Sequence, residues 1–407
     1  MPDTARLWPD AIQAELPKLV EIRHHLHAHP ELAFQEFETS KLVLRELQNL
    51  GLEIRSGMAK GTGIVAVLRG KGPGANSREA KAVALRGDMD ALPIVEETGL
   101  NYASTVPGRM HACGHDGHTT MLLGAAKVLA RHPERLNGTV VFCFQPAEEG
   151  GGGGRYLVEE GALDNPACSA AFALHGFPSM PVGHVAVRPG PAQAASDGLH
   201  IVVHGVGGHG AAPHLAVDPI VLAARVIEAL QGVVSREVNP VESAVVTIGA
   251  IHGGEASNVI PQSVELRGTI RTLKDDIRRK VHEAVKRTVE HTCLAGGGRA
   301  DVTIRDGYPV VVNDLAASAF ALDTARGAFG AERVHELPLP SMGGEDFAYF
   351  LRKVPGAFIR VGVATRQPYP GLHHPAFDFS DGAIPVGVEL FCRLAERYLA
   401  EGFGAAD

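Results

Sequence analysis

The stretch AVALRGDMDALP, residues 82–93, decides the fold, because an apolar run in it ends on charged residues. Residues 82–86 predict a buried strand, and Asp88 and Asp90 follow at its carboxyl end. Two acidic side chains at that end of a strand lie where α/β sheets place their sites. The alternative is a solvated turn, and this segment alone does not decide between the two.

Short apolar runs on either side of this stretch alternate with helical patterns. Further buried strands are predicted at 64–69, 139–144 and 170–174, helices at 118–131 and 155–161, and helical periodicity runs through 10–50. Strands that alternate with helices indicate a sheet covered on both faces.

Residues 199–306 follow a different pattern. Strands are predicted at 199–203, 243–251, 263–271 and 300–305, and helices at 218–234 and 274–294. This βαββαβ order is typical of ferredoxin-like domains. After it, residues 313–403 return to alternating α and β. The predicted fold class is therefore α/β: a domain of residues 1–190 and 307–407, interrupted by an inserted ferredoxin-like α+β domain of residues 191–306.

Composition narrows the classes of function. The chain has 407 residues and a formal net charge of −8 without a basic block, so no nucleic-acid partner is expected. With 45% hydrophobic and 21% charged residues it is typical of globular proteins. We expect no signal peptide and no membrane partner, because no stretch has the required apolar length. Five sparse cysteines argue against a disulfide framework and favour a cytoplasmic location.

The segment HACGHDGH, residues 111–118, concentrates candidate metal ligands. They are His111, Cys113, His115 and His118. In an extended loop, residues two apart project to the same side, so Cys113 and His115 can face one metal. Asp116 could instead cap the helix that follows. The alternative is a loop whose histidines only form hydrogen bonds; the spacing is not that of a closed structural zinc site.

The segment QPAEEG, residues 145–150, supplies two adjacent carboxylates, Glu148 and Glu149, at the end of a predicted strand. Adjacent side chains point in different directions, so one can bind metal while the other stays within reach of a water molecule. Hydrolytic metal sites need this division between a Lewis acid and a general base. The alternative is an exposed acidic turn.

Further histidines complete a candidate ligand set. His175 lies at a predicted strand end, and His373 and His374 lie near the C-terminus. A lone histidine is more often structural, yet the segments together supply enough ligands for two metals if one ligand bridges. Residues 23–31 (RHHLHAHPE) look like a metal tract, but they end a helix, where cations are favourable, and a structural role is preferred. His209, flanked by glycines in the inserted domain, suggests contact with a closely approaching group.

Taken together, these segments resemble the amidohydrolase branch of the M20 metallopeptidases, which includes hippurate hydrolases, N-acyl-amino-acid amidohydrolases and plant auxin-conjugate hydrolases. The matching segments are residues 23–31 with Glu36 and Thr39, 86–93, 110–118, 145–150, 173–178, 207–214, 258–261, 268–271, 343–347 and 372–379. They run in order over nearly the whole chain, so the set is specific.

The resemblance implies two divalent metal ions in the α/β domain and Glu148 as general base. The implied ligands are Cys113, His115, Glu149, His175 and His373. Cys113 stands where the wider superfamily uses a bridging carboxylate, and a thiolate is a softer ligand. Zinc is the expected metal, with manganese, cobalt and nickel as alternatives. Because His374 stands where the family has a small polar residue, the choice between this pair of histidines stays open.

The resemblance also implies that the inserted domain forms the interface of a homodimer or a dimer-based oligomer. His209 is then expected to reach the site of the neighbouring subunit and donate to the oxyanion. Asn258 and Arg271 are implied to bind substrate. Asp88 and Asp90 are expected to orient the imidazoles of the metal ligands.

The expected activity is metal-dependent cleavage of an N-acyl or N-aroyl amino acid, such as a hippurate, to a carboxylic acid and a free amino acid. Glu148 would deprotonate an activated water and then protonate the leaving nitrogen. Arg271 would hold the substrate carboxylate. One alternative is a dipeptidase or small-peptide carboxypeptidase with the same dinuclear site. Another is a non-catalytic metal-binding homologue, against which the spare carboxylate of Glu148 argues.

Overall fold

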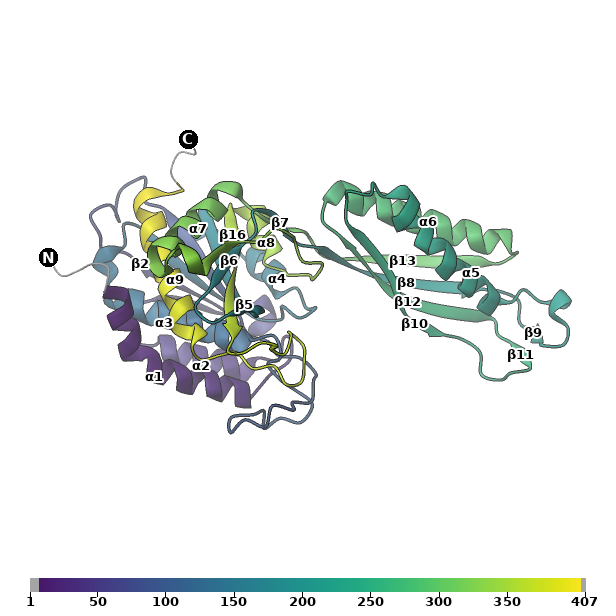
Figure 1. The fold of residues 1–407 in the computed structure, drawn as a ribbon, viewed down its shortest axis with the longest axis horizontal. Helices are drawn as coiled ribbons and strands as arrows, with labels where there is room; N and C mark the ends of the chain where they lie inside the picture. Colours follow the sequence, from purple (N-terminus) through teal and green to yellow (C-terminus); the bar gives the residue numbers. More distant parts are fainter. Residues whose placement is uncertain (1–6, 404–407) are drawn as a thin grey trace. The chain divides into compact units, whose positions relative to one another are not determined.

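The computed structural model describes residues 7–403 and divides the chain into two compact units (Figure 1). The first unit comprises Met1–Ala192, Val312–Leu339 and Asp346–Asp407, and the second comprises Gln193–Val311 and Pro340–Glu345. Strands β7 (Gly190–Gln193) and β14 (Val311–Asn313) lie where the chain passes between them. The predicted fold class, an α/β domain interrupted by an inserted α+β domain, is confirmed.

The first unit is built on an eight-stranded mixed sheet. The strands, in order across the sheet, are β1 (Glu53–Met58), β2 (Gly63–Arg69), β4 (Thr139–Gln145), β3 (Ala82–Asp88), β5 (Ala170–Pro181), β16 (Gly356–Ala364), β6 (Val185–Val187) and β15 (Val334–Glu336). Strand β3 runs parallel to both β4 and β5, and β16 runs parallel to β5. All residues of β3 are buried, as expected for parallel strands covered by helices on both faces.

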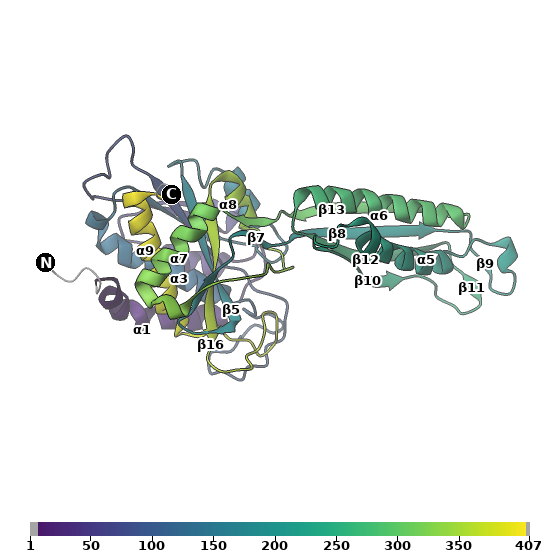
Figure 2. The ribbon, with the colours of Figure 1, turned by 45° about the horizontal axis from the view of Figure 1, so that its top comes forward.

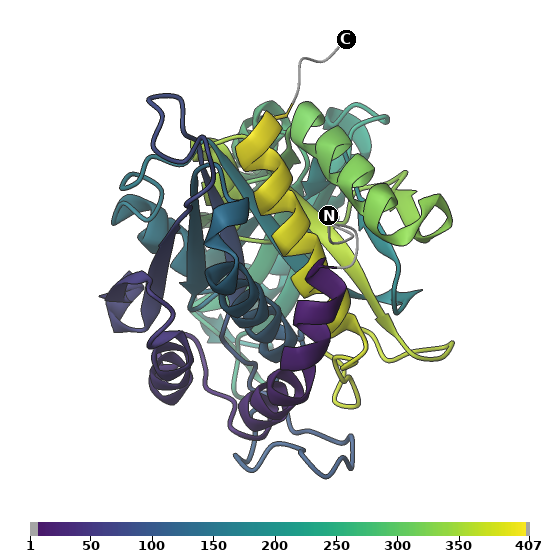
Figure 3. The same ribbon diagram turned by 90° about the vertical axis from the view of Figure 1, so that its left-hand side faces the viewer.

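Helices cover both faces of this sheet. They are α1 (Leu7–Ala28), α2 (Phe37–Leu47), α3 (His115–Arg131), α4 (Gly153–Glu159), α7 (Leu315–Phe329), α8 (Ala348–Lys353) and α9 (Ala383–Glu401). Helices α1, α3, α7 and α9 lie on one face, with α1 and α9 in front in Figure 3. Helices α4 and α8 lie on the other face (Figure 1).

Helix α3 is the central helix of the first unit. Its residues from His115 to Leu129 are buried. A Cβ atom at Gly124 would lie 2.6 Å from Val388 of α9 and 2.8 Å from Leu19 of α1, so glycine lets the three helices pack closely. The middle of α3 is thereby fixed against its neighbours.

The second unit is a four-stranded antiparallel sheet with two helices on one face (Figure 2). In order across the sheet its strands are β10 (Ala244–His252), β12 (Ser263–Thr272), β8 (Ala195–His204) and β13 (Arg299–Tyr308), and its helices are α5 (Pro219–Gly232) and α6 (Asp275–Ala295). Burial alternates along β8, because one face packs on the helices and the other is open. The strands β9 (Gly208–His209) and β11 (Val259–Ile260) form a separate pair.

All five cysteines are free and buried. Cys143, Cys168, Cys293 and Cys392 therefore pack as small buried hydrophobic residues. Within residues 7–403, no helix combines the length and the apolar character that crossing a membrane requires.

Candidate metal centre

The side chains singled out from the sequence gather at one edge of the large sheet. Asp88 ends β3, and Arg86 lies opposite Ala173 in the parallel ladder of β3 and β5. Two residues further along each strand, Asp88 and His175 therefore lie at the same level. Helix α3 begins beside them with His115. The topology thus brings motifs from distant parts of the sequence to one place.

Two groups of candidate ligand atoms share the thiol of Cys113. One group joins it to His115 and His175, the other to Glu149 and His373, and within each group the atoms lie within 4.8 Å of one another. Cys113 Sγ is 3.5 Å from His175 Nε2, and His373 Nε2 is 3.2 Å from Glu149 Oε1. Three protein ligands per ion leave an open position, as catalytic zinc sites require.

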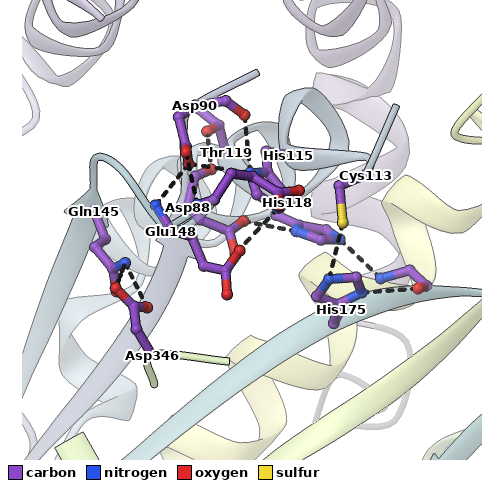
Figure 4. A network of polar contacts seen from close by, with 12 residues as sticks. Asp88, Asp90, Cys113, His115, His118, Thr119, Gln145, Glu148, His175 and Asp346 are labelled. Carbon is purple, nitrogen blue, oxygen red and sulfur yellow. Dashed lines mark hydrogen bonds and ion pairs between the residues drawn. The ribbon is translucent and has the colours of Figure 1, made fainter. Parts of the chain in front are cut away.

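The tautomers of the buried histidines fit metal binding. His115 Nδ1 donates to the backbone oxygen of Asp90 at 2.8 Å, and His175 Nδ1 donates to the oxygen of Gly176 at 2.8 Å. Each Nε2 then keeps its lone pair, and Figure 4 shows Cys113 and His175 pointing toward one another. Among the described residues, His115 Nε2 is buried without a hydrogen-bond partner. An orphaned lone pair of this kind fits a metal ion.

Asp90 connects a candidate ligand to the acidic pair (Figure 4). Its Oδ1 lies 3.2 Å from His115 Nδ1 and accepts the backbone amide of Glu148 at 2.9 Å. Its Oδ2 accepts the amide of Glu149, also at 2.9 Å. One buried carboxylate therefore contacts His115 and the backbone of both glutamates.

Asp88 lies beneath the imidazoles. It accepts from His118 Nδ1 at 2.7 Å and pairs with Arg86 at 2.5 Å, and its Oδ2 is 3.7 Å from His115 Nε2. Burial alone would raise the pKa of Asp88, but Arg86 and the two histidines hold that pKa well below its usual range. The carboxylate therefore stays ionised beside the guanidinium of Arg86.

The structure gives partners to two further residues of the segment 111–118 and corrects one interpretation. His118 belongs to a candidate group with Asp88 and His115, but both of its ring nitrogens are engaged: Nδ1 bonds to Asp88, and Nε2 accepts the amide of Gly176 at 2.7 Å. Asp116 does not cap α3, whose N-cap position is Gly114 without a side-chain cap. Instead Asp116 is buried and lies 2.9 Å from His27 Nδ1, since a buried carboxylate needs a cationic partner.

The residues of the tract 23–31 have a structural role. Besides the favourable position of cations at a helix C-terminus, they form buried ion pairs. Arg23 is fully buried and pairs with Asp378 at 2.7 Å and Asp381 at 2.8 Å. His27 is equally buried, and although burial lowers its pKa, its bond to Asp116 helps to raise that pKa to about 9. These ion pairs fasten α1 to α3 and to residues far along the chain.

His373 is held in an unusual conformation. Its φ is +63°, and its amide donates to Ala112 at 2.8 Å. A left-handed non-glycine residue costs roughly 1–3 kcal/mol and is typical of functional sites. Contacts with Cys113 and Glu149 raise the pKa of His373 to about 10, so this corner favours positive charge. His374 instead accepts a backbone amide two residues further on.

Sequence reasoning missed the network beneath the site. Arg86 donates to Gln145 at 2.9 Å and pairs with Asp346 at 3.0 Å. Gln145 donates to Asp346 at 2.7 Å (Figure 4). Asp346 also accepts the amide of Gly154 at 2.8 Å. The available signal was a charged residue, Arg86, inside an apolar strand pattern, because such a residue must find buried partners.

The structure brings together two of the three candidate residues of the inserted domain. His209 is paired with Val259, and the amide of Gly210 donates to the oxygen of Asn258 at 2.8 Å. Arg271 lies near the other end of β12, which begins just after β11, so about 27 Å of strand separates the two ends. His209 and Asn258 therefore lie at one end of this unit and Arg271 at the other.

The two ligand groups share one member and lie where the strands of the sheet end. Their thiol, imidazoles and carboxylates define a dinuclear metallohydrolase. The chain belongs to peptidase family M20/M25/M40, whose family model matches residues 84–397. The resemblance found in the sequence is thereby confirmed, and so is the prediction of a metal-dependent amide hydrolase.

Individual relatives match over nearly their full length. The chain is 42% identical over 383 residues to N-acetyl-L-cysteine deacetylase of Bacillus subtilis, covering 94% of this chain and 88% of that protein. It is 41% identical over 389 residues to IAA-amino acid hydrolase ILR1-like 4 of Arabidopsis thaliana, covering 94% and 86%. The solved YxeP protein of Bacillus subtilis, described as a dinuclear metal-binding peptidase of family M20, matches with TM-score 0.81 and 36% identity over 95% of this chain and 99% of that one.

Proposed function

We propose that this protein hydrolyses N-acyl or N-aroyl amino acids, hippurate-like compounds, to a carboxylic acid and a free amino acid. The observation that carries the proposal is the pair of ligand groups sharing Cys113, with Glu148 buried beside them. The names of the two relatives, a deacetylase of N-acetyl-L-cysteine and a hydrolase of IAA-amino acids, support a substituted amino acid as substrate. The catalytic domain of this proposal is residues 1–190 and 307–407.

Five residues would hold two divalent ions: Cys113, His115, Glu149, His175 and His373. Nitrogen and thiolate ligands favour zinc, with manganese, cobalt and nickel as alternatives. When bound, the ions supply positive charge that acidifies a water molecule and polarises the scissile carbonyl. A thiolate ligand must stay reduced, which supports action in the cytoplasm, as do the five free cysteines.

Glu148 is the proposed general base. Its carboxylate shares a group with His115 and Glu149, in which the atoms lie within 4.8 Å of one another, and its backbone is fixed by Asp90. It takes the proton from the attacking water and later gives it to the leaving nitrogen, so that the amine departs neutral. Positioned proton transfer of this kind contributes about 10²- to 10⁴-fold. Asp88 and Asp90 orient the surrounding imidazoles and backbone.

The inserted domain, residues 191–306, is proposed to form a homodimer or dimer-based oligomer. Strand β10 is a sheet edge, and α5 packs beside it. Nine exposed large apolar side chains lie in this unit: Val206, Leu215, Ile220, Val221, Val241, Val245, Ile251, Val259 and Leu294. Of these, Val245 and Ile251 lie on β10 and Ile220 and Val221 lie on α5, and an apolar edge of this kind supports self-association.

The dimer would complete the active site. The partner subunit's His209 donates to the oxyanion of the tetrahedral intermediate in this proposal, a role worth about 10²- to 10³-fold. Asn258 and Arg271 bind substrate, and the guanidinium of Arg271 holds the carboxylate. The separation of His209 and Arg271 within one inserted unit supports contributions from two chains to one site.

A substrate panel tests the proposal. Metal-reconstituted protein is assayed with N-acetyl, N-benzoyl and indole-acyl amino acids, and with free dipeptides at matched concentrations. We expect turnover of the acylated amino acids and little of the dipeptides. A preference for dipeptides would indicate a dipeptidase or small-peptide carboxypeptidase, and full metal content without any turnover would indicate a metal-binding homologue.

A further inference from the structure

Three consecutive backbone amides in the turn after β4 donate to buried carboxylates. The amides of Glu148 and Glu149 bond to Asp90, as described above. The amide of Ala147 bonds to Glu36 Oε1 at 2.8 Å, across 111 positions of sequence. The turn that carries the proposed base and a proposed ligand is therefore held by two acids from distant segments.

Ala147 needs this support because its backbone is left-handed. Its φ is +56°, a conformation that a residue with a Cβ atom rarely adopts. It directly precedes Glu148, so a relaxation of its backbone would redirect the base and the ligand after it. The contact of Glu36 with the amide of Ala147 opposes that relaxation.

Glu36 is itself firmly placed. It is fully buried at the position directly before α2, and its Oε1 also accepts the amide of Phe34 at 3.0 Å. Its Oε2 accepts from the hydroxyl of Thr62 at 2.8 Å. Burial and then the nearby charge of Asp90 raise the pKa of Glu36 to about 7. An uncharged amide could therefore replace it, since Oε1 accepts equally well and the hydroxyl can turn.

The packing around the turn agrees with this role. A Cβ atom at Gly151 would lie 2.6 Å from the Cβ of Ala147 and 2.9 Å from the ring of Phe34. Phe34 also has a left-handed backbone, with φ of +60°, and Lys60 lies over its ring at 4.2 Å. The segment holding Glu36 thus contacts the turn through both its ring and its carboxylate.

We propose that Glu36 is a positioning residue that fixes the strained turn at Ala147 and so aims Glu148 and Glu149. Its role requires a side-chain oxygen that accepts a hydrogen bond and a side chain long enough to bring that oxygen to the amide of Ala147. The effect on turnover rests on the proposed function, whereas the effect on the turn and on the ligand Glu149 does not.

Three variants test the acceptor. Glu36→Gln keeps an oxygen at the same reach, Glu36→Asp withdraws it by one methylene, and Glu36→Met removes it. We expect Glu36→Gln to keep kcat within about 3-fold, and the other two to lose about 10- to 10²-fold in kcat with KM little changed, since a shift near 1 Å can cost 10²-fold. The matched control is Glu46→Met, in the helix α2 that follows Glu36, which removes an ion pair with Lys127 seen at 2.6 Å.

A second readout does not depend on turnover. The cobalt-loaded protein is compared by visible absorption, and the φ of Ala147 is determined from crystals of the variants. We expect Glu36→Asp to alter both and Glu36→Gln neither, even if no substrate is found for the wild type. If Glu36→Met does not fold, the comparison of Glu36→Asp with Glu36→Gln is sufficient to test the proposal.

Three results would overturn the proposal. One is a folded Glu36→Asp protein with normal kcat, spectrum and backbone at Ala147. Another is a Glu36→Gln loss as large as that of Glu36→Met. The third is an equal loss of kcat in Glu46→Met, which would attribute the effect to general destabilisation.

Discussion

Replacement of Cys113 by serine should release both metal ions, whereas loss of a ligand from one group should release one. Cys113 is the residue common to the two ligand groups, while His175 belongs to one and His373 to the other. A serine hydroxyl does not ionise as a thiol does, so Cys113→Ser removes the shared negative ligand. His175→Ala and His373→Ala each remove one neutral donor.

The expected loss of metal affinity depends on how many of the two sites each variant affects. Loss of an outer hydrogen-bonding partner of a metal ligand commonly costs 10- to 100-fold in affinity, so loss of a ligand should cost at least about 10²-fold at its site. At about 1.4 kcal/mol per tenfold, that is roughly 3 kcal/mol per ion. Cys113→Ser weakens two sites, so the combined cost is roughly 6 kcal/mol, against half of that for either histidine variant.

The assay is metal content per chain after dialysis against a weak chelator, measured on folded protein. We expect two ions in the wild type, one in each histidine variant and none in Cys113→Ser. Cys143→Ser is the matched control, because Cys143 is equally buried but lies in the middle of β4. Retention of two ions by Cys113→Ser, or the same single loss in all three variants, would refute the shared thiolate.

Three further predictions concern other parts of the molecule. Mixing His209→Ala with Glu148→Gln subunits should restore activity, because each hybrid dimer has one site with both groups; no recovery after verified subunit exchange would place His209 in its own chain's site. His27→Gln should cost roughly 3 kcal/mol of unfolding free energy near pH 6 and little near pH 10. The reason is that burial lowers the pKa of His27 but Asp116 and Glu96 raise it to about 9, so the ion-pair stability is complete below about 6.5 and lost through pH 9; pH-dependent denaturation curves that stay parallel would contradict this. Peroxide treatment before metal loading should leave less activity after metal reconstitution than the same treatment of metal-loaded protein, because the sulfur of Cys113 is shielded only when bound; equal recovery would count against that ligand.

The elements of the fold with strong local patterns could be predicted from the sequence. The apolar runs of β3 and β4 and the βαββαβ order of the inserted unit are strong signals, because buried parallel strands and half-buried strands differ in periodicity. Strand β5 was predicted to end at 174, yet it continues to Pro181. Glycine and proline in that stretch weaken the local signal, and pairing with β16 overrides it.

The roles of charged residues inside the motifs were less predictable. Asp116 stands at a helix start, and only the fold shows that its partner is His27, 89 positions away. The two adjacent histidines near the C-terminus look alike in sequence, and the left-handed backbone of His373 separates them. Such contacts join residues distant in sequence, so no local pattern reports them.

The central claim, that Glu148 serves as the base of a metal-dependent amide hydrolysis, is tested most directly by Glu148→Gln. Metal content and turnover of an N-acyl amino acid are measured on one preparation. The amide is nearly isosteric but cannot accept the proton, so we predict two ions per chain and a kcat lower by about 10²- to 10⁴-fold. Near-normal turnover would remove Glu148 from the mechanism, and loss of metal would make it a ligand instead.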